Sequence, residues 1–213
     1  MTPERQARIE QVAACRQTDL TVFMERVHKA HNVAAILRTC DAVGVMEAHA
    51  VPPTGGIPPL NHTAQGAQRW VKLHRHHDAA AGLRQLRKAG HQIYAAHFSD
   101  QAVDFRKPDY TKPTAIVLGT EKFGVSEAAL AECDGEIIIP MIGMTQSLNV
   151  SVATALILYE AQRQRQLAGM YERKSLEQEP YKSLVKQWIE REFERRRKGR
   201  GSGLPGAVAK GKD

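Results

Sequence analysis

The sequence has 213 residues, of which 42% are apolar and 25% are charged. This composition is typical of a soluble globular protein, and the length suits one domain with a full hydrophobic core and short appendages. No apolar run approaches the roughly 20 residues of a membrane span, and residues 1–6 lack the basic-then-apolar pattern of a signal peptide. We therefore expect no membrane contact and a cytoplasmic location.

The net charge of +7 is concentrated at the end of the chain. Residues 182–213 hold ten Lys or Arg against four Asp or Glu, which gives +6 and leaves +1 for the rest. A basic tail on a nearly neutral body usually binds a polyanion, most often a nucleic acid. The run Arg195, Arg196, Arg197 and Lys198 is the predicted contact. A solvated or disordered tail is the alternative explanation.

Hydrophobic periodicity and breaker residues predict strands that alternate with helices. Helices are expected at 3–17, 31–43, 79–88, 126–132, 147–168 and 179–198, and strands at 20–27, 48–51, 70–73, 92–97, 114–118 and 136–140. This alternation favours an α/β fold with a mostly parallel sheet and helices on both faces.

The same patterns divide the chain into four parts. We expect an N-terminal helix within 1–17, a main domain over 18–171, a helical extension over 172–198 and a tail over 199–213. The tail contains five glycines and few apolar residues, so it is predicted to be disordered.

Cysteines and histidines give no sign of a metal site. Cys15, Cys40 and Cys133 form no CxxC pair, so we expect ordinary buried or half-buried thiols. The cluster of His74, His76 and His77 is interrupted by an arginine, and no second group of ligands is evident nearby. Because zinc needs three or four convergent ligands, no metal is predicted.

The first of three segments that could carry chemistry is His31 to Arg38. Arg38 interrupts the apolar stripe of Ile36, Leu37 and Cys40. An arginine beside a buried stripe needs a partner or an anionic ligand. Asn32 lies six residues before Arg38, so the two do not share one tight face of a helix. A salt bridge at the helix edge is the alternative interpretation.

The second segment is the loop after the strand at 114–118. Gly119 and Gly124 flank it, and Glu121 lies inside it. Glycines let a ligand approach the backbone closely. The spacing matches neither a dinucleotide-binding loop nor a phosphate loop, so a plain tight turn is the simpler explanation.

The third segment runs from the apolar strand at 136–140 into the helix at 147–168. Ser147, Asn149 and Ser151 crowd the start of that otherwise apolar helix. Their hydroxyl and amide groups could cap the helix or present donors to a ligand. The apolar loop before them would suit an adenine ring or a methyl sulfonium, because ligand pockets are largely apolar with a few placed polar groups.

Together the three segments resemble the three motifs of the SPOUT (SpoU) methyltransferases. The motifs are Asn-five-residues-Arg at 32–38, Gly-x-Glu-x-x-Gly at 119–124 and Ser-Leu-Asn-Val-Ser-Val at 147–152, and the likeness runs from about residue 3 to residue 171. The stretches 19–32, 41–44, 142–144 and 159–166 are similar to the TrmH branch of that superfamily.

The resemblance implies a deep trefoil knot at the C-terminal end of the sheet and an obligate homodimer. It implies S-adenosylmethionine as cofactor and 2′-O-methylation of a tRNA ribose, guanosine 18 of the D-loop, without a metal. The catalytic residues it implies are Arg38, Asn32, Glu121, Ser147 and Asn149, and the cofactor contacts are the backbone around Ala96, Gly119, Ile139 and Leu148.

Two other functions remain open at this stage. The same chemistry could act on ribosomal RNA, although many such enzymes carry an added N-terminal RNA-binding domain, for which 3–17 is too short. A non-catalytic RNA-binding module of the same fold is disfavoured by the presence of Asn32, Arg38, Glu121 and Asn149 together.

Overall fold

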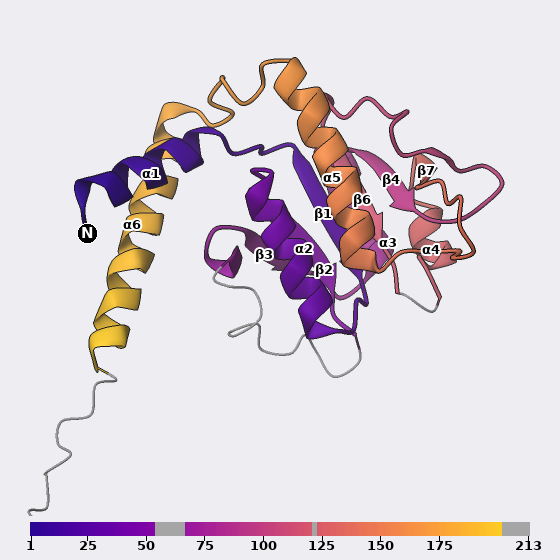
Figure 1. Ribbon diagram of the computed structural model, residues 1–213, viewed down its shortest axis with the longest axis horizontal. Coiled ribbons are helices and arrows are strands. Elements are labelled where there is room, and N and C mark those ends of the chain that lie inside the picture. Colours follow the sequence, from indigo (N-terminus) through magenta and orange to yellow (C-terminus); the bar gives the residue numbers. More distant parts are fainter. Residues whose placement is uncertain (54–66, 121–122, 202–213) are drawn as a thin grey trace, which may run out of the picture. The chain divides into compact units, whose positions relative to one another are not determined.

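A computed structural model of the chain describes residues 1–53, 67–120 and 123–201 (Figure 1). The helices are α1 (Pro3–Ala14), α2 (Ala30–Ala42), α3 (Ala79–Lys88), α4 (Glu127–Leu130), α5 (Val150–Leu167) and α6 (Gln178–Gly201), with a 3₁₀ turn η1 (Ala67–Arg69). The strands are β1 (Leu20–Glu25), β2 (Glu47–Val51), β3 (Lys72–Arg75), β4 (Gln92–Ala96), β5 (Val103–Asp104), β6 (Thr114–Leu118) and β7 (Gly135–Ile138). Residues 1–13 and 177–213 form one unit, and residues 14–176 form the other.

The larger unit is built on one seven-stranded sheet in the order β3-β2-β1-β6-β4-β7-β5. Every pair of neighbouring strands is parallel. The predicted α/β class is therefore confirmed. The register pairs Met24 with Leu118 and Ala95 with Val117, so β1, β6 and β4 end side by side. The loops that follow these strands accordingly all lie at the C-terminal end of the sheet.

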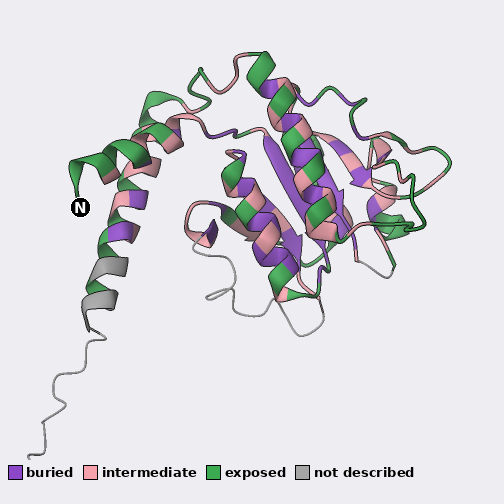
Figure 2. Ribbon diagram, viewed as in Figure 1, coloured by how far each residue is buried: buried purple, intermediate pink, exposed green. Residues whose placement is uncertain are grey.

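Alternating side chains give the sheet two buried faces, each covered by helices. Leu20, Val22 and Met24 of β1 pack in one apolar cluster with residues of α2 and α5. Phe23 of the same strand packs in a second cluster with residues of α3 and α4. Because successive strand residues point to opposite faces, this division is the one expected for a sheet between two helical layers. In Figure 2 the central strands are almost wholly buried, and α5 alternates between buried and exposed residues.

Several boundaries differ from the prediction. β5 and η1 were not expected, because elements of two and three residues leave no periodic pattern. The helix expected from Ser147 begins at Val150, since Asn149 is its N-cap. α6 continues to Gly201 rather than ending at Lys198, as a single glycine at 199 lowers helix stability by only about 1 kcal/mol. The first three residues of the tail expected over 199–213 are thus helical, and the remainder, 202–213, lies outside the described residues.

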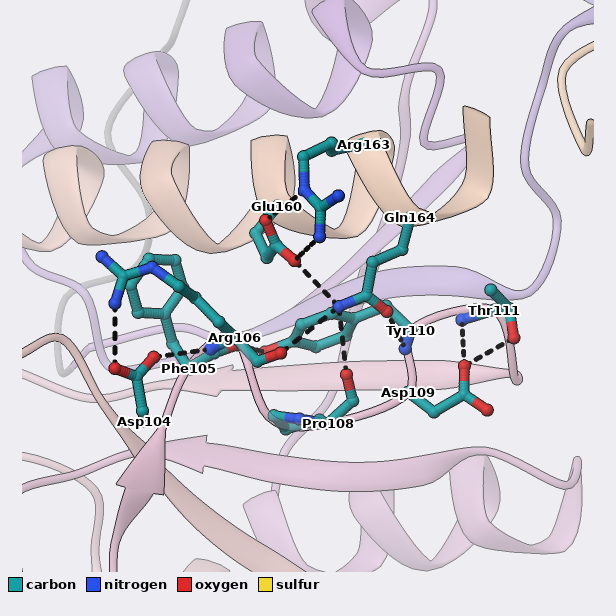
Figure 3. Close-up of polar contacts among 10 residues, drawn as sticks. All are labelled: Asp104, Phe105, Arg106, Pro108, Asp109, Tyr110, Thr111, Glu160, Arg163 and Gln164. Carbon is teal, nitrogen blue, oxygen red and sulfur yellow. Dashed lines mark hydrogen bonds and ion pairs between the residues drawn. The ribbon is translucent and has the colours of Figure 1, made fainter. Parts of the chain in front are cut away.

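Polar side chains of α5 fasten that helix to the segment between β5 and β6 (Figure 3). The Gln164 amide donates to the carbonyl of Pro108 at 3.2 Å and to Glu160 at 2.9 Å, and its side-chain oxygen accepts from the Tyr110 amide at 2.9 Å. Arg165 is fully buried and donates to the Tyr110 carbonyl at 2.8 Å and to Gln17 at 3.0 Å. These bonds fix the far half of the helix whose first residues enter the site described below.

The smaller unit contains α1 and α6. The Tyr181 hydroxyl of α6 donates to the carbonyl of Glu10 in α1 at 3.0 Å, and Arg5 lies 3.7 Å from the buried Glu192 carboxylate. Trp188 is buried, although it belongs to a strongly charged helix. No helix in the described part of the chain is long and apolar enough to cross a membrane.

Candidate active site

A cavity of about 540 Å³ opens where β4, β6 and β7 end and α5 begins. In open parallel sheets, ligands bind outside the carboxyl ends of the strands. The described lining residues are Ala96, His97, Phe98, Leu118, Gly119, Thr120, Phe123, Gly124, Ile137, Ile138, Ile139, Met141, Gln146, Ser147, Leu148, Asn149, Val150, Ala153 and Ile157. None of them is an Asp, Glu, Lys or Arg, so this described wall is mainly apolar with a few uncharged polar groups.

The loop after β6 forms one wall of the cavity and is held closed at its base. The amides of Thr120 and Gly124 each donate to the other residue's carbonyl at 2.9 Å. A Cβ on Gly119 would lie 2.1 Å from the backbone of Gly124, so only glycine fits there. Gly124 has φ +67°, which also favours glycine. The predicted residue Glu121 belongs to this loop but lies outside the described residues.

The start of α5 joins the first and third predicted motifs. The Asn149 side-chain oxygen accepts from the Ser151 amide at 2.9 Å and caps the helix. Its amide nitrogen donates to the side-chain oxygen of Asn32 at 3.2 Å. The capping alternative is thus confirmed for Asn149, and its amide donor faces Asn32 at the cavity; donation to a ligand stays a prediction. The contact spans 117 positions of the chain.

The structure places Asn32 and Arg38 differently within α2. Asn32 is 2% exposed and faces Asn149. Arg38 is exposed, and among the described residues it makes no hydrogen bond or ion pair. The alternative of a salt bridge at the helix edge is therefore not seen in the described part of the chain. An exposed guanidinium on the helix that carries Asn32 is available to an anion or to another chain.

The four residues predicted to hold a cofactor, Ala96, Gly119, Ile139 and Leu148, all line the cavity, as do Ser147 and Asn149. The predicted RNA-binding run lies in α6, outside this unit. The Arg197 side chain is exposed, whereas the side chains of the other three residues in that run are not described.

Sequence reasoning missed several residues near the cavity. Buried Glu25, at the end of β1, accepts from both the amide and the hydroxyl of Ser126 at 2.9 and 2.6 Å, and so ties β1 to the start of α4. Phe98 and Phe123 line the cavity yet are 76% and 75% exposed. Phe98 comes two residues after β4, and Phe123 lies in the glycine-flanked loop after β6; this position beyond a strand end was the one signal available in the sequence.

The histidines form a packed stack rather than a ligand set. His49 of β2 stacks on His74, with ring centroids 4.8 Å apart, and on His76 at 5.2 Å. His49 and His76 share a 2.9 Å hydrogen bond, and His74 lies 2.9 Å from the Glu47 carboxylate. Burial, with a smaller contribution from neighbouring charges, lowers the pKa of His49 to about 3. No group of three metal-ligating side chains occurs among the residues the structure describes.

The predicted behaviour of the cysteines is confirmed, since Cys15, Cys40 and Cys133 are free and buried or half-buried. Burial raises the pKa of the Cys40 thiol to about 12, and the pKa of Cys133 to about 12 for the same reason. Neither thiol is a reactive nucleophile in this state.

Comparison with known proteins gives consistent matches over most of the chain. Residues 19–159 match the model of the SpoU rRNA Methylase family. The chain is 56% identical over 188 residues to the tRNA (guanosine(18)-2'-O)-methyltransferase of Thermus thermophilus, covering 88% of this chain and 97% of that protein.

Two solved structures are also similar. The crystal structure of the A. aeolicus TrmH/SpoU tRNA modifying enzyme matches with a TM-score of 0.84 and 44% identity, covering 89% of this chain and 96% of that one. The SpoU methyltransferase AviRb of Streptomyces viridochromogenes, solved in complex with AdoMet, matches with a TM-score of 0.63 and 27% identity, covering 72% and 64%.

Proposed function

The chain belongs to the SpoU rRNA Methylase family, and on that basis we propose that it transfers a methyl group from S-adenosylmethionine to the ribose 2′-hydroxyl of guanosine 18 in tRNA. The choice of tRNA and of this position rests on the activity of the Thermus thermophilus relative, to which the chain is 56% identical. The observation that carries the proposal is the meeting of the first and third motifs at one cavity, where Asn149 donates to Asn32 at 3.2 Å.

The described wall of the cavity fits the proposed cofactor. An adenosine and a thioether need apolar walls with a few directed polar groups, and the described lining offers such a surface with no formal charge apart from any on His97. Residues Ala96, Gly119, Ile139 and Leu148 would hold the cofactor through their backbone groups. When bound, S-adenosylmethionine supplies an electrophilic methyl group on a positively charged sulfur.

The chain's own residues would position the hydroxyl and stabilise the charge that develops on it. Asn149 and Asn32 fix each other at the cavity, and Ser147 and Glu121 complete the proposed site. Arg38 would hold the adjoining phosphate and the 2′-oxygen, because a guanidinium stabilises a developing alkoxide. A guanidinium keeps its proton at ordinary pH and cannot accept another, so the proton of the hydroxyl would pass to a phosphate oxygen of the RNA.

We also propose that the chain forms a homodimer, in which Arg38 of one subunit completes the active site of the other. Val152, Leu156 and Tyr159 form an exposed apolar stripe on α5, opposite its buried residues. A second copy of the chain would cover this stripe. Leu156→Glu should therefore give a monomer by sedimentation, whereas Val103→Glu, at an apolar side chain of similar exposure on β5, should stay dimeric. Two dimeric variants would contradict this interface. The trefoil knot implied by the family stays a prediction.

The basic run Arg195 to Lys198 is proposed as a contact for tRNA phosphates, supported by its charge and by the exposure of Arg197. Such contacts add affinity without reading sequence.

The direct test is to incubate the purified chain with labelled S-adenosylmethionine and unmodified tRNA, and then to map the methylated nucleotide. We expect one 2′-O-methyl group at guanosine 18 and none on a transcript with another base at that position. Ribosomal RNA should be a poor substrate when the two compete. Methylation of ribosomal RNA alone would favour the other activity of the family, and binding of tRNA without methyl transfer would indicate a non-catalytic module.

A further inference from the structure

Phe98 is an aromatic side chain exposed at the rim of the cavity. It is 76% exposed although it lines the same cavity as Gly119 and Asn149. Phe98 follows β4 and Phe123 follows β6, and these strands are neighbours in the sheet. The loops after these two strands therefore lie next to each other at the C-terminal end of the sheet. None of the functions proposed above uses either ring.

The loop that carries Phe98 is held in place by hydrogen bonds. The His97 amide donates to the carbonyl of Ile137 at 3.2 Å. Ser99 closes a turn, since its hydroxyl oxygen accepts from the Gln101 amide at 3.3 Å and its carbonyl accepts from the Ala102 amide at 3.2 Å. The ring is thus presented from a fixed backbone, so little ordering would be needed when a flat partner stacks on it.

Three partners could cover the ring: the cofactor, a second subunit or the RNA. The interior of the cavity already offers apolar side chains to the cofactor, among them Leu118, Ile139 and Ile157. The apolar stripe available to a second subunit lies on the exposed side of α5. An RNA whose ribose reaches into the cavity must place its bases against the rim, and single-stranded bases are commonly held by stacking on aromatic side chains.

We propose that Phe98 is the stacking platform for a nucleobase of the RNA, at or next to the methylated nucleotide. This inference rests on the proposed function and adds a residue that determines how the RNA is held. A ribose that reaches into the cavity draws its nucleotide away from the neighbouring bases, and an aromatic surface at the rim compensates for the stacking that is lost.

The test compares Phe98→Ala, Phe98→Leu and Phe98→Trp in the full-length protein. Phe98→Ala should raise the KM for tRNA by about 5- to 150-fold, because one stacked base is worth about 1–3 kcal/mol. Phe98→Trp should restore the wild-type KM, whereas Phe98→Leu should not, since it keeps an apolar surface but has no ring. Leu167→Ala, at a position 77% exposed on α5, is the matched control and should leave the KM for tRNA unchanged.

Cofactor affinity, measured by calorimetry without tRNA, should be unchanged in Phe98→Ala, and the sedimentation coefficient should also stay the same. A loss of cofactor affinity with an unchanged KM for tRNA would show that the ring covers the cofactor and would overturn the inference. Dissociation of the variant into monomers, or no effect at all, would overturn it equally. Affinity for tRNA measured without turnover keeps this result separate from the proposed function, because it needs no methyl transfer by the wild-type chain.

Discussion

Acidification should destabilise the chain through the histidine stack on β2 and β3. His49 lies between His74 and His76, and its folded-state pKa is lowered to about 3, mainly by burial. The unfolded chain has an ordinary histidine pKa of about 6.5 and so binds the proton first as the pH falls. The stabilising effect of a neutral His49 is therefore fully present above about pH 6.5 and decreases continuously from there toward about pH 3.

The size of this effect follows from the two pKa values. Each pH unit below 6.5 lowers the free energy of unfolding by about 1.4 kcal/mol, so the loss between pH 7 and pH 5 is about 2 kcal/mol. The ring is partly open to water, which reduces the expected loss to about 1–2 kcal/mol. The groups facing His49 are Glu47, Lys72, His74 and His76, with His91 farther away. Of these, His76 also has a pKa lowered by burial and contributes in the same direction.

Urea unfolding at pH 7 and pH 5 measures the loss directly. His49→Asn keeps a polar atom near the position of Nδ1, which bonds His76, but removes the titrating ring. This variant should lose less stability than the wild type between the two pH values, by about 1–2 kcal/mol. His28→Asn, at an exposed histidine, should behave as the wild type. Equal losses in His49→Asn and the wild type would refute the argument.

Two further predictions concern Arg38 and the basic run at 195–198. Arg38→Ala should lower kcat by at least 100-fold, because the guanidinium that stabilises the developing alkoxide is lost. Dimerisation and affinity for S-adenosylmethionine should be unchanged, because Arg38 does not line the cavity. Near-normal turnover would show that Arg38 is not part of the site. Replacing Arg195 to Lys198 with glutamine should weaken tRNA binding and flatten its salt dependence by about 0.7–0.9 log units for each phosphate that is no longer neutralised. Substitution is preferable to truncation because Trp188 of the same helix is buried, and parallel salt plots with equal intercepts would show that the run does not bind RNA.

Much of the fold could be predicted because its signals are local. The strand Thr114–Leu118 and the helix Ala79–Lys88 have the bounds expected from their apolar periods and flanking breakers. Asp78, just before that helix, caps it by accepting from the Ala81 amide at 2.8 Å. Such features depend on residues within one turn or one strand, which is the range that a sequence pattern covers.

Features that depend on distant residues were not predictable. Nothing near Glu25 in the sequence indicates that it accepts two hydrogen bonds from Ser126, 101 positions later. The exposure of Phe98 likewise depends on which loops are neighbours at the C-terminal end of the sheet. Those neighbours follow from the strand order rather than from composition. The residues of the site could be named from their motifs, but their distances and burial required the tertiary structure.

Asn149 allows the structural and chemical roles of one residue to be separated. Its oxygen caps α5 through the Ser151 amide, and its nitrogen donates to Asn32. Asn149→Asp keeps a good capping oxygen but loses the donor, whereas Asn149→Ala loses both, at a cost in stability of about 0.5–2 kcal/mol for the cap. Both variants lose the bond to buried Asn32, so we expect both to be less stable than the wild type, and Ala to be less stable than Asp by the cost of the lost cap.

The value of kcat should depend on the bond that the Asn149 nitrogen donates to Asn32, not on the cap that its oxygen forms. Both Asn149→Asp and Asn149→Ala should lower kcat and weaken cofactor binding, because each leaves the Asn32 oxygen without the donor that fixes it. The measurements are urea unfolding, calorimetric cofactor affinity and methyl transfer, made on the same three proteins. If Asn149→Asp kept normal cofactor affinity and kcat, Asn149 would be a capping residue alone, and the bond to Asn32 would have no part in the chemistry.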